Sequence, residues 1–87
     1  MVNKINHRGN SVKLGKRIRS IRRSKDMDQE TLAGNAGVSR SYLSLVERGQ
    51  IAGERLSIGY ILKITKCFGM TVNELLDGVE FDSPDSD

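Results

Sequence analysis

Three side chains capable of hydrogen bonding, Arg40, Ser41 and Ser44, stand close together in a stretch without glycine or proline. In a helix that begins after Ser39, Arg40 and Ser44 lie one turn apart on the same face. An outward-pointing arginine can donate two hydrogen bonds to the O6 and N7 edge of guanine, and a serine hydroxyl can serve a neighbouring base. These residue types at this spacing predict a surface that reads base edges in duplex DNA. The alternatives are an arginine that contacts only phosphates and serines that face solvent.

Two short helices joined by a tight turn would place these side chains at the surface. Ser39 is suited to begin the helix that carries them, and Gly49 is suited to end it. Asp28 is suited to begin the preceding helix, and Gly37 supplies the backbone conformation of a tight turn between the two. The side chains expected on the inner sides of the two helices are apolar: Leu32, Ala33, Ala36, Leu43 and Val46.

Three further helices are expected around this pair, and no segment shows the alternation of apolar and polar residues that is typical of a β-strand. The first, over residues 11–24, carries an apolar stripe formed by Leu14, Ile18 and Ile21. The next runs from the cap Ser57 to Gly69, with an expected inner face of Ile58, Ile61, Leu62, Ile64, Thr65 and Phe68. The last begins at a capping box formed by Thr71 and Glu74 and holds Val72, Leu75 and Leu76. The sequence therefore predicts an all-α fold of five helices.

The 87 residues suffice for one domain with a single modest core. We expect a flexible basic arm at residues 1–10, a helical domain at 11–77 and an acidic tail at 78–87. No apolar run is long enough to span a membrane, and no signal-peptide pattern is present. The only cysteine, Cys67, and the only histidine, His7, cannot form a disulfide or a four-ligand zinc site. We therefore expect no cofactor, no metal, no membrane partner and a cytoplasmic location.

Charge is distributed very unevenly along the chain. Residues 1–25 contain nine lysines and arginines and no acid, whereas residues 74–87 contain six acids and no base. The basic end indicates a polyanionic partner that is bound through its phosphates. One alternative is a solvated helix face without a partner. Another is a helix on a membrane surface, which would require a wider apolar face than Leu14, Ile18 and Ile21 provide.

The chain also resembles a known family. The stretch from Gln29 to Gly49 follows the pattern Q-x-x-L-A-x-x-A-G-V-S-x-x-x-[IL]-S-x-x-E-x-G. It is similar to the helix-turn-helix of phage repressor and Cro-type regulators, the XRE or lambda-repressor-like family. The resemblance extends to Leu14–Arg19 and to Ser57–Leu76, so it covers about residues 12–77. It implies a compact five-helix DNA-binding domain with the helix-turn-helix at the second and third helices.

Within that family, Arg40–Ser44 resembles the recognition helix of restriction–modification controller proteins. The chain departs from the family pattern at three places. Asp26 stands where glycine is common, and Asp28 stands where threonine is usual. The loop between Glu47 and Ser57 is longer and lacks a proline, which leaves open the DNA-backbone contacts that relatives make there.

The resemblance implies roles for individual residues. A recognition helix at residues 39–47 enters the major groove, and Leu45 joins Arg40, Ser41 and Ser44 as a base-facing residue, its alternatives being the core or a dimer contact. Gln29 corresponds to a residue that binds phosphate, and four others are further phosphate candidates: Ser39, Tyr42, Arg48 and Arg17. The alternative for Tyr42 is a ring that only packs. Arg22 and Glu47 are expected to form a structural ion pair.

Related proteins bind as dimers to two half-sites about one helical turn apart, so the resemblance implies a pseudo-palindromic operator, near the protein's own promoter. With no separate oligomerisation domain, the dimer contact is expected at the last helix and its exit, through Leu75, Leu76, Val79 and Phe81. The alternative for Val79 and Phe81 is packing on their own core. The acidic tail is expected to aid solubility, with contact to RNA polymerase or screening of nonspecific DNA as the alternatives.

Two other classes of function compete with DNA binding. An enzyme is disfavoured because the sequence offers no paired carboxylates, no activated Cys–His pair and no phosphate-binding glycine loop. A protein-interaction module built on the same fold, such as an antitoxin, stays open, and the acidic tail would then bind the toxin.

Overall fold

The computed structural model describes residues 13–80, in which five α-helices and one short 3-10 helix follow one another. They are α2 (Leu14–Ser24), α3 (Gln29–Ala36), α4 (Arg40–Glu47), η1 (Gly53–Arg55), α5 (Ile58–Phe68) and α6 (Val72–Leu76). The predicted five-helix, all-α architecture is confirmed, and η1 is an addition within the expected loop at 49–56. The predicted arm at 1–10, residues 81–87 of the predicted tail at 78–87, and the expected dimer residue Phe81 lie outside the described residues.

The predicted helix caps are present in the structure. The side chains of Asp28, Ser39 and Ser57 each accept a hydrogen bond from the backbone N–H three residues later, at 2.8, 3.1 and 3.0 Å. Thr71 and Glu74 form the reciprocal capping box at the start of α6. Asp26, which replaces the family's common glycine, adopts a left-handed backbone with φ of 58°. Aspartate is one of the residues that tolerate this conformation, so the turn after α2 keeps its shape.

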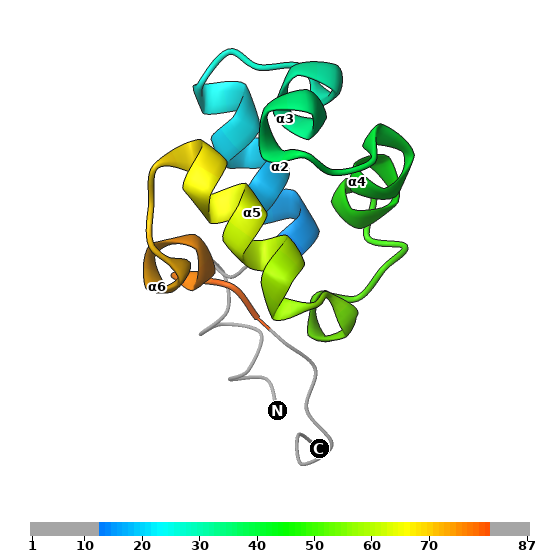
Figure 1. Cartoon of the computed structure of the whole chain (residues 1–87). Coiled ribbons are helices and arrows are strands. Elements are labelled where there is room, and N and C mark those ends of the chain that lie inside the picture. The colour runs from blue at the N-terminus through cyan, green and yellow to red at the C-terminus, as the bar shows by residue number, and fades with distance from the viewer. Residues whose placement is uncertain (1–12, 81–87) are drawn as a thin grey trace, which may run out of the picture.

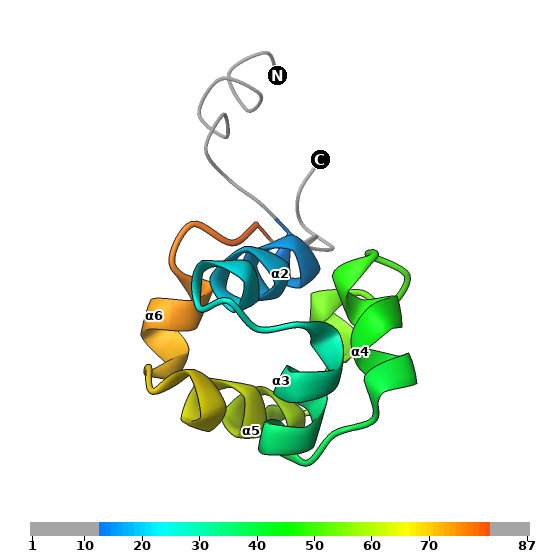
Figure 2. The same ribbon diagram turned by 90° about the horizontal axis from the view of Figure 1, so that it is seen from above.

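The helices enclose a single aliphatic core. Figures 1 and 2 show α2 and α5 on opposite sides of the molecule, with α6 at one end and α3 and α4 at the other. The fully buried side chains come from every one of these helices: Leu14, Ile18, Leu32, Leu43, Val46, Ile64 and Leu75. Since burial of apolar surface is the main stabilising contribution, α4 cannot leave the core without exposing Leu43 and Val46.

Helix α4 approaches α2 closely at Gly15. A Cβ atom on Gly15 would collide with the backbone carbonyl of Val46, near the end of α4. This contact is between backbones, so a flexible side chain cannot move aside to relieve it. The absence of a side chain at Gly15 therefore allows α4 to lie this close to α2.

A buried ion pair joins the same two helices. Arg22 on α2 donates from Nε to Oε2 of Glu47 at 2.8 Å and from Nη2 to Oε1 at 2.9 Å. Its Nη1 donates to the carbonyl of Met27 at 2.7 Å. Arg22 and Glu47 are only 7% and 3% exposed. The structure thus contains the pair that the family resemblance implied, in a bidentate geometry that constrains orientation as well as distance.

The predicted inner face of α5 was too wide. Ile64, Thr65 and Phe68 are buried, but Ile58 is 64% exposed and Leu62 is 50% exposed. The six residues that the sequence placed inside extend over nearly half of the helix circumference, and the core contacts a narrower stripe of it. Ile58 and Leu62 lie at the side of that stripe. The sequence alone could not show which edge of a broad apolar helix face remains exposed to solvent.

Replacing Gly15 by alanine should lower the free energy of unfolding by about 1–3 kcal/mol, because α2 and α4 must separate to admit the Cβ atom. Gly34 is the matched control, because it is exposed on α3 and a Cβ atom added there would meet nothing within 4 Å. Gly34→Ala should raise stability by about 0.5–1 kcal/mol. Urea unfolding followed by circular dichroism measures both, and equal changes would show that α2 and α4 are not in close contact.

Replacing Glu47 by alanine should cost about 3–5 kcal/mol, because it leaves the buried guanidinium of Arg22 without its counter-charge. Glu30, exposed in the first turn of α3, is the control, and Glu30→Ala should cost no more than about 1 kcal/mol. The same unfolding measurement applies. If Glu47→Ala lowered the free energy of unfolding as little as Glu30→Ala does, the Arg22–Glu47 pair would contribute no more than a surface ion pair.

Candidate nucleic-acid interface

The outward side of α4 carries the residues predicted to read bases. Arg40 and Ser41 are exposed at its start, and Ser44 and Leu45 are half-buried one turn later. A shallow hollow on this side is lined by Arg40, Ser41, Ser44, Leu45 and Arg48. The structure therefore brings the four predicted base-contacting residues together on one face, beside one predicted phosphate-contacting arginine.

A second hollow adjoins the first and is strongly basic. It shares Ser44 and Arg48 with the first, and its full lining is Arg19, Arg22, Arg23, Gln29, Ser44, Glu47 and Arg48. Glu47 is the one acid among these residues, and its carboxylate is paired with Arg22. The charges of Arg19, Arg23 and Arg48 are left in excess, which makes the hollow suited to an anion such as a phosphate.

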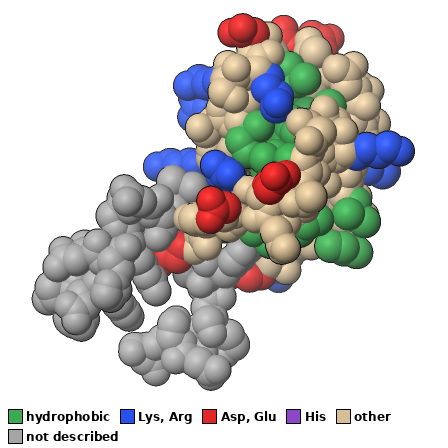
Figure 3. Space-filling model, turned by 90° about the vertical axis from the view of Figure 1, so that its left-hand side faces the viewer, with side chains coloured by type: hydrophobic (Ala, Val, Ile, Leu, Met, Phe, Trp, Pro, Cys, Tyr) green, Lys and Arg blue, Asp and Glu red, His purple; other side chains and the backbone are tan. Residues whose placement is uncertain are grey.

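The basic surface continues along α2. Lys16, Arg19, Ser20 and Arg23 line a third hollow, which shares Arg19 and Arg23 with the second. We call the surface formed by Arg40, Arg48, Arg19, Arg23 and Lys16 the basic track. Figure 3 shows lysine and arginine side chains projecting at several places from the outline of the molecule. Arg19 and Arg23 were not predicted individually as contact residues; they belonged only to the basic segment at residues 1–25. Lys16, Arg19, Ser20 and Arg23 follow the spacing i, i+3, i+4, i+7, which places them on one face of a helix.

Gln29 is held at the junction of α3 and α4. Its Nε2 donates to Oε1 of Glu47 at 3.0 Å, the same oxygen that accepts from Arg22. An amide has two N–H groups, and Glu47 takes one of them. Gln29 is also the first residue of α3, where backbone N–H groups have no acceptor within the helix. Its position agrees with the phosphate contact that the resemblance implied, because a helix N-terminus favours an anion.

Two tyrosines connect α4 to α5. The rings of Tyr42 and Tyr60 meet edge to face, with centroids 5.3 Å apart and planes at 75°. The hydroxyl of Tyr60 is buried without a hydrogen-bond partner, and desolvation raises the pKa of Tyr60 to about 12. Tyr42 is half-buried, so its ring packs while it remains beside the exposed face of α4. Sequence reasoning did not find Tyr60, since nothing in its spacing distinguishes it from other residues of α5.

Two predicted contact residues are occupied elsewhere. Arg17 donates from Nε to the carbonyl of Leu75 at 3.0 Å and from Nη2 to that of Glu74 at 2.7 Å. Its guanidinium therefore caps the end of α6, on another side of α2 from the basic track, and is engaged away from the surface suited to phosphate. Leu75, expected at a dimer contact, is 0% exposed and belongs to the core. Leu76 and Val79 are half-buried and pack against that core.

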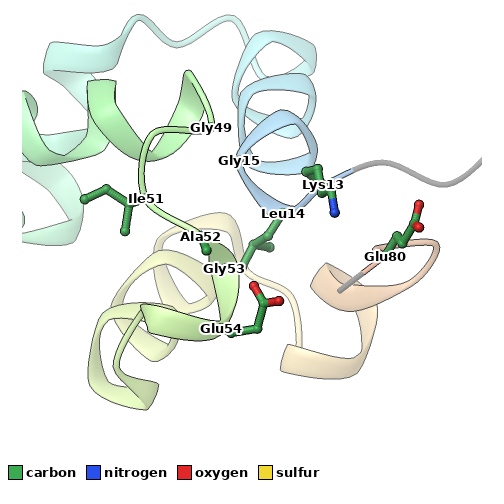
Figure 4. Close-up of a pocket in the computed structure, with 9 residues that line it drawn as sticks. All are labelled: Lys13, Leu14, Gly15, Gly49, Ile51, Ala52, Gly53, Glu54 and Glu80. Atoms are coloured by element: carbon green, nitrogen blue, oxygen red, sulfur yellow. The ribbon is translucent and has the colours of Figure 1, made fainter. Parts of the chain in front are cut away.

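A separate pocket lies where the first turn of α2 meets the loop after α4 (Figure 4). It is lined by Lys13, Leu14, Gly15, Gly49, Ile51, Ala52, Gly53, Glu54 and Glu80. Two of these side chains are carboxylates, which makes the pocket a poor site for phosphate. Across residues 13–80, His, Cys, Asp and Glu nowhere gather in threes that could hold a metal ion. None of the helices in that range combines the length and apolar character needed to span a bilayer.

Comparison with known proteins agrees with this geometry. The family model described as Helix-turn-helix matches residues 18–75. The chain is 36% identical over 70 residues to the HTH-type transcriptional regulator DdrOP3 of Deinococcus deserti, covering 80% of this chain and 52% of that protein. The chain thus spans about half the length of this relative.

Solved structures give the same assignment. The restriction-modification controller protein C.AhdI from Aeromonas hydrophila superposes with a TM-score of 0.66 at 42% identity, covering 74% of this chain and 92% of that one. The biofilm regulator SinR, crystallised in complex with DNA, superposes with a TM-score of 0.67 at 36% identity, covering 74% and 98%. The chain belongs to the helix-turn-helix family, in its XRE or lambda-repressor-like branch.

Proposed function

We propose that this protein is a transcriptional regulator that binds specific double-stranded DNA. It places residues 39–47 in the major groove and recognises a pseudo-palindromic operator as a homodimer. The observation that carries the proposal is the outward face of α4, where Arg40, Ser41 and Ser44 stand beside an excess of positive charge. The SinR structure in complex with DNA supports it, because the two domains superpose over 74% of this chain.

Base recognition rests on the first turns of α4. Arg40 is exposed at the first position of the helix, from which a guanidinium can reach O6 and N7 of guanine. Ser41 and Ser44 contact neighbouring base edges, and Leu45 packs against a thymine methyl group. This division follows from side-chain chemistry, since a hydroxyl can hydrogen-bond to a base edge whereas the apolar side chain of Leu45 can only pack against a methyl group.

Phosphate contacts surround that face and set the position of the helix in the groove. Gln29, Ser39, Tyr42 and Arg48 bind the backbone beside the base-reading residues, and Arg19 and Arg23 continue the contact along α2. Such contacts carry no sequence information, but they fix the register of the protein on the duplex and add affinity that depends on salt.

A single α4 has eight residues and reads few bases, so specific recognition requires two copies on half-sites about 34 Å apart. The subtype that we propose is a restriction–modification controller protein acting at its own promoter, supported by the similarity to C.AhdI. We place its action in the cytoplasm, where a regulator of this class meets its operator.

Replacing Arg40 by alanine should weaken binding to the cognate duplex by about 1–3 kcal/mol, or roughly 5- to 150-fold, because one bidentate contact to guanine is lost. Binding to random duplex should weaken much less. The cognate duplex is first selected by wild-type protein from a random pool, which also reports half-site, spacing and symmetry. Arg40→Lys is the matched control, since it keeps the charge but loses the planar guanidinium. This variant should lose the preference for the cognate duplex while its affinity for random duplex stays unchanged. Equal losses on both duplexes would make Arg40 a phosphate contact only.

Replacing Arg19 or Arg23 by glutamine should reduce the slope of log K against log salt by about one for each variant, because one phosphate contact disappears. The preference for selected over random duplex should stay the same. Lys63→Gln removes an equal charge from an exposed position on α5 that lines none of the three basic hollows, and its slope should match the wild type. If the salt dependence of binding were unchanged in the Arg19 and Arg23 variants, these residues would not contact phosphates, and the DNA interface would be limited to α3 and α4.

A further inference from the structure

Tyr42 and Tyr60 occupy equivalent places in their two helices. Tyr42 is the third residue of α4, and its backbone N–H donates to Oγ of the capping residue Ser39 at 3.1 Å. Tyr60 is the third residue of α5, and its backbone N–H donates to Oγ of Ser57 at 3.0 Å. The edge-to-face contact of the two rings therefore joins the capped first turns of two helices. Through this contact the start of α4 is tied to a helix outside the helix-turn-helix.

The ring contact supplements the packing of the helix backbones. Helix α4 packs chiefly against α2 and α3, whereas α5 packs chiefly against α3 and α6. A long side chain from each helix can connect α4 with α5, and the half-buried Tyr42 and Tyr60 meet in this way, with ring centroids 5.3 Å apart. Such a pair has a preferred geometry as well as an attraction, because ring edges are positive and ring faces are negative.

Tyr42 and Glu47 hold α4 at opposite ends and on opposite flanks. The buried apolar stripe of α4 is formed by Leu43 and Val46. At about 100° per residue, Tyr42 lies on one side of this stripe and Glu47 on the other, about 140° apart around the helix. Packing of the stripe alone would let the helix roll about its axis, since the hydrophobic effect has no direction. Arg22 restrains the last turn through Glu47, and the tyrosine pair is the matching restraint on the first turn.

The ring of Tyr60, and not its hydroxyl, provides this restraint. The hydroxyl is buried without a hydrogen-bond partner. Desolvation raises the pKa of Tyr60 to about 12, with smaller contributions from Tyr42 and Glu47, so the side chain is neutral at physiological pH. A buried hydroxyl without a partner lowers stability, whereas the ring packs favourably. An effect of Tyr60 on DNA binding should therefore depend on its ring and involve no charge.

We propose that Tyr60 is a positioning residue for base recognition, whose ring holds Tyr42 and thereby the first turn of α4 in the orientation that Arg40 requires. Tyr60 lines none of the hollows that contain Arg40, Arg48 or the basic residues of α2, so its influence on the interface passes through Tyr42. Arg40 precedes Tyr42 by two residues in the same turn. A bidentate contact needs two N–H groups aligned with O6 and N7 of guanine, and a rolled or tilted helix loses that alignment. The inference rests on the proposed function, in which Arg40 reads a base.

The first test compares three variants of the full chain on the selected duplex and on random duplex. Tyr60→Leu removes the ring, Tyr60→Phe removes only the hydroxyl, and Phe68→Leu is the matched control. Phe68 is buried at the other end of α5, so its replacement removes an aromatic ring from the same helix, away from the tyrosine pair. Urea unfolding followed by circular dichroism reports the stability of each variant.

Tyr60→Leu should lower the preference for the selected duplex by about 3- to 10-fold, because the contact of Arg40 is misaligned rather than removed. The slope of log K against log salt should stay unchanged, because no charge is lost. Tyr60→Phe should keep the preference and raise the urea midpoint, because the unpartnered hydroxyl is gone. Phe68→Leu should lower the urea midpoint but keep the preference. A loss of preference that Phe68→Leu shares, or that Tyr60→Leu lacks, would overturn the proposed role.

A double-mutant cycle tests whether Tyr60 acts through the first turn of α4. The contact that Tyr60 is proposed to align is absent in Arg40→Ala. Adding Tyr60→Leu to that variant should therefore change the preference by less than about twofold. Full additivity of the two losses would show that Tyr60 affects DNA binding independently of Arg40 and would overturn the proposal.

Hydrogen exchange in the protein without DNA separates this proposal from the proposed function. The amide of Leu43 donates to the carbonyl of Ser39 at 3.0 Å, so its exchange reports opening of the first turn of α4. Tyr60→Leu and Tyr42→Leu break the ring contact from its two sides, and each should speed this exchange at least about threefold, whereas Tyr60→Phe should not. Unchanged exchange in both leucine variants would refute the restraint on α4. Failure of the wild type to select any duplex would refute the proposed function, and the exchange rates would still decide whether the ring contact restrains α4.

Discussion

The carboxylate of Glu47 is the point on which the candidate interface depends. It accepts two hydrogen bonds from Arg22 of α2 and one from Gln29 of α3, and it belongs to the last residue of α4. Apolar packing of Leu43 and Val46 keeps α4 on the core, but the hydrophobic effect has no direction and does not by itself fix a helix's rotation. Directional hydrogen bonds to Glu47 supply that constraint. The net gain in stability from such a buried pair is small once desolvation is included, so its main effect is on orientation.

The same pair also determines the charge that DNA would meet. An unpaired carboxylate at position 47 would lie within the hollow that contains Arg19, Arg23 and Arg48 and would repel phosphate. Arg22 neutralises this carboxylate inside the protein, so the surrounding arginines give the hollow a net positive charge. The backbone contact at Gly15 complements this arrangement, because it brings the basic face of α2 close to the end of α4. The continuous basic track is thus a consequence of how tightly these two helices pack.

The features that the sequence predicted well are those with a local physical cause. Asp28, Ser39, Ser57 and Thr71 cap helices because their side chains reach backbone N–H groups three residues away, whatever the tertiary fold. The pairing of Arg22 with Glu47 spans 25 residues and came only from the family resemblance. The less successful predictions all depended on which neighbour covers a side chain. Arg17 turns to the carbonyls of α6, Leu75 fills the core and Leu62 remains outside, and no periodicity distinguishes these environments. Arg19 and Arg23 became individual candidates only when the structure placed them beside Gln29 and Arg48.

Helix α4 has few residues that could contact bases, so specific binding needs contributions from other parts of the molecule. Of its eight residues, Leu43 and Val46 are buried in the core and Glu47 is held in the ion pair, which leaves only the first turns for the proposed base contacts. So few base contacts cannot separate one operator from the many competing sites of a genome. Adding affinity through phosphates raises binding to every sequence alike, since those contacts carry no sequence information. Only a second copy multiplies specificity, because both half-sites must then match at once. A weak contact between copies suits this purpose better than a strong one, since it makes tight binding conditional on finding both half-sites in the correct spacing.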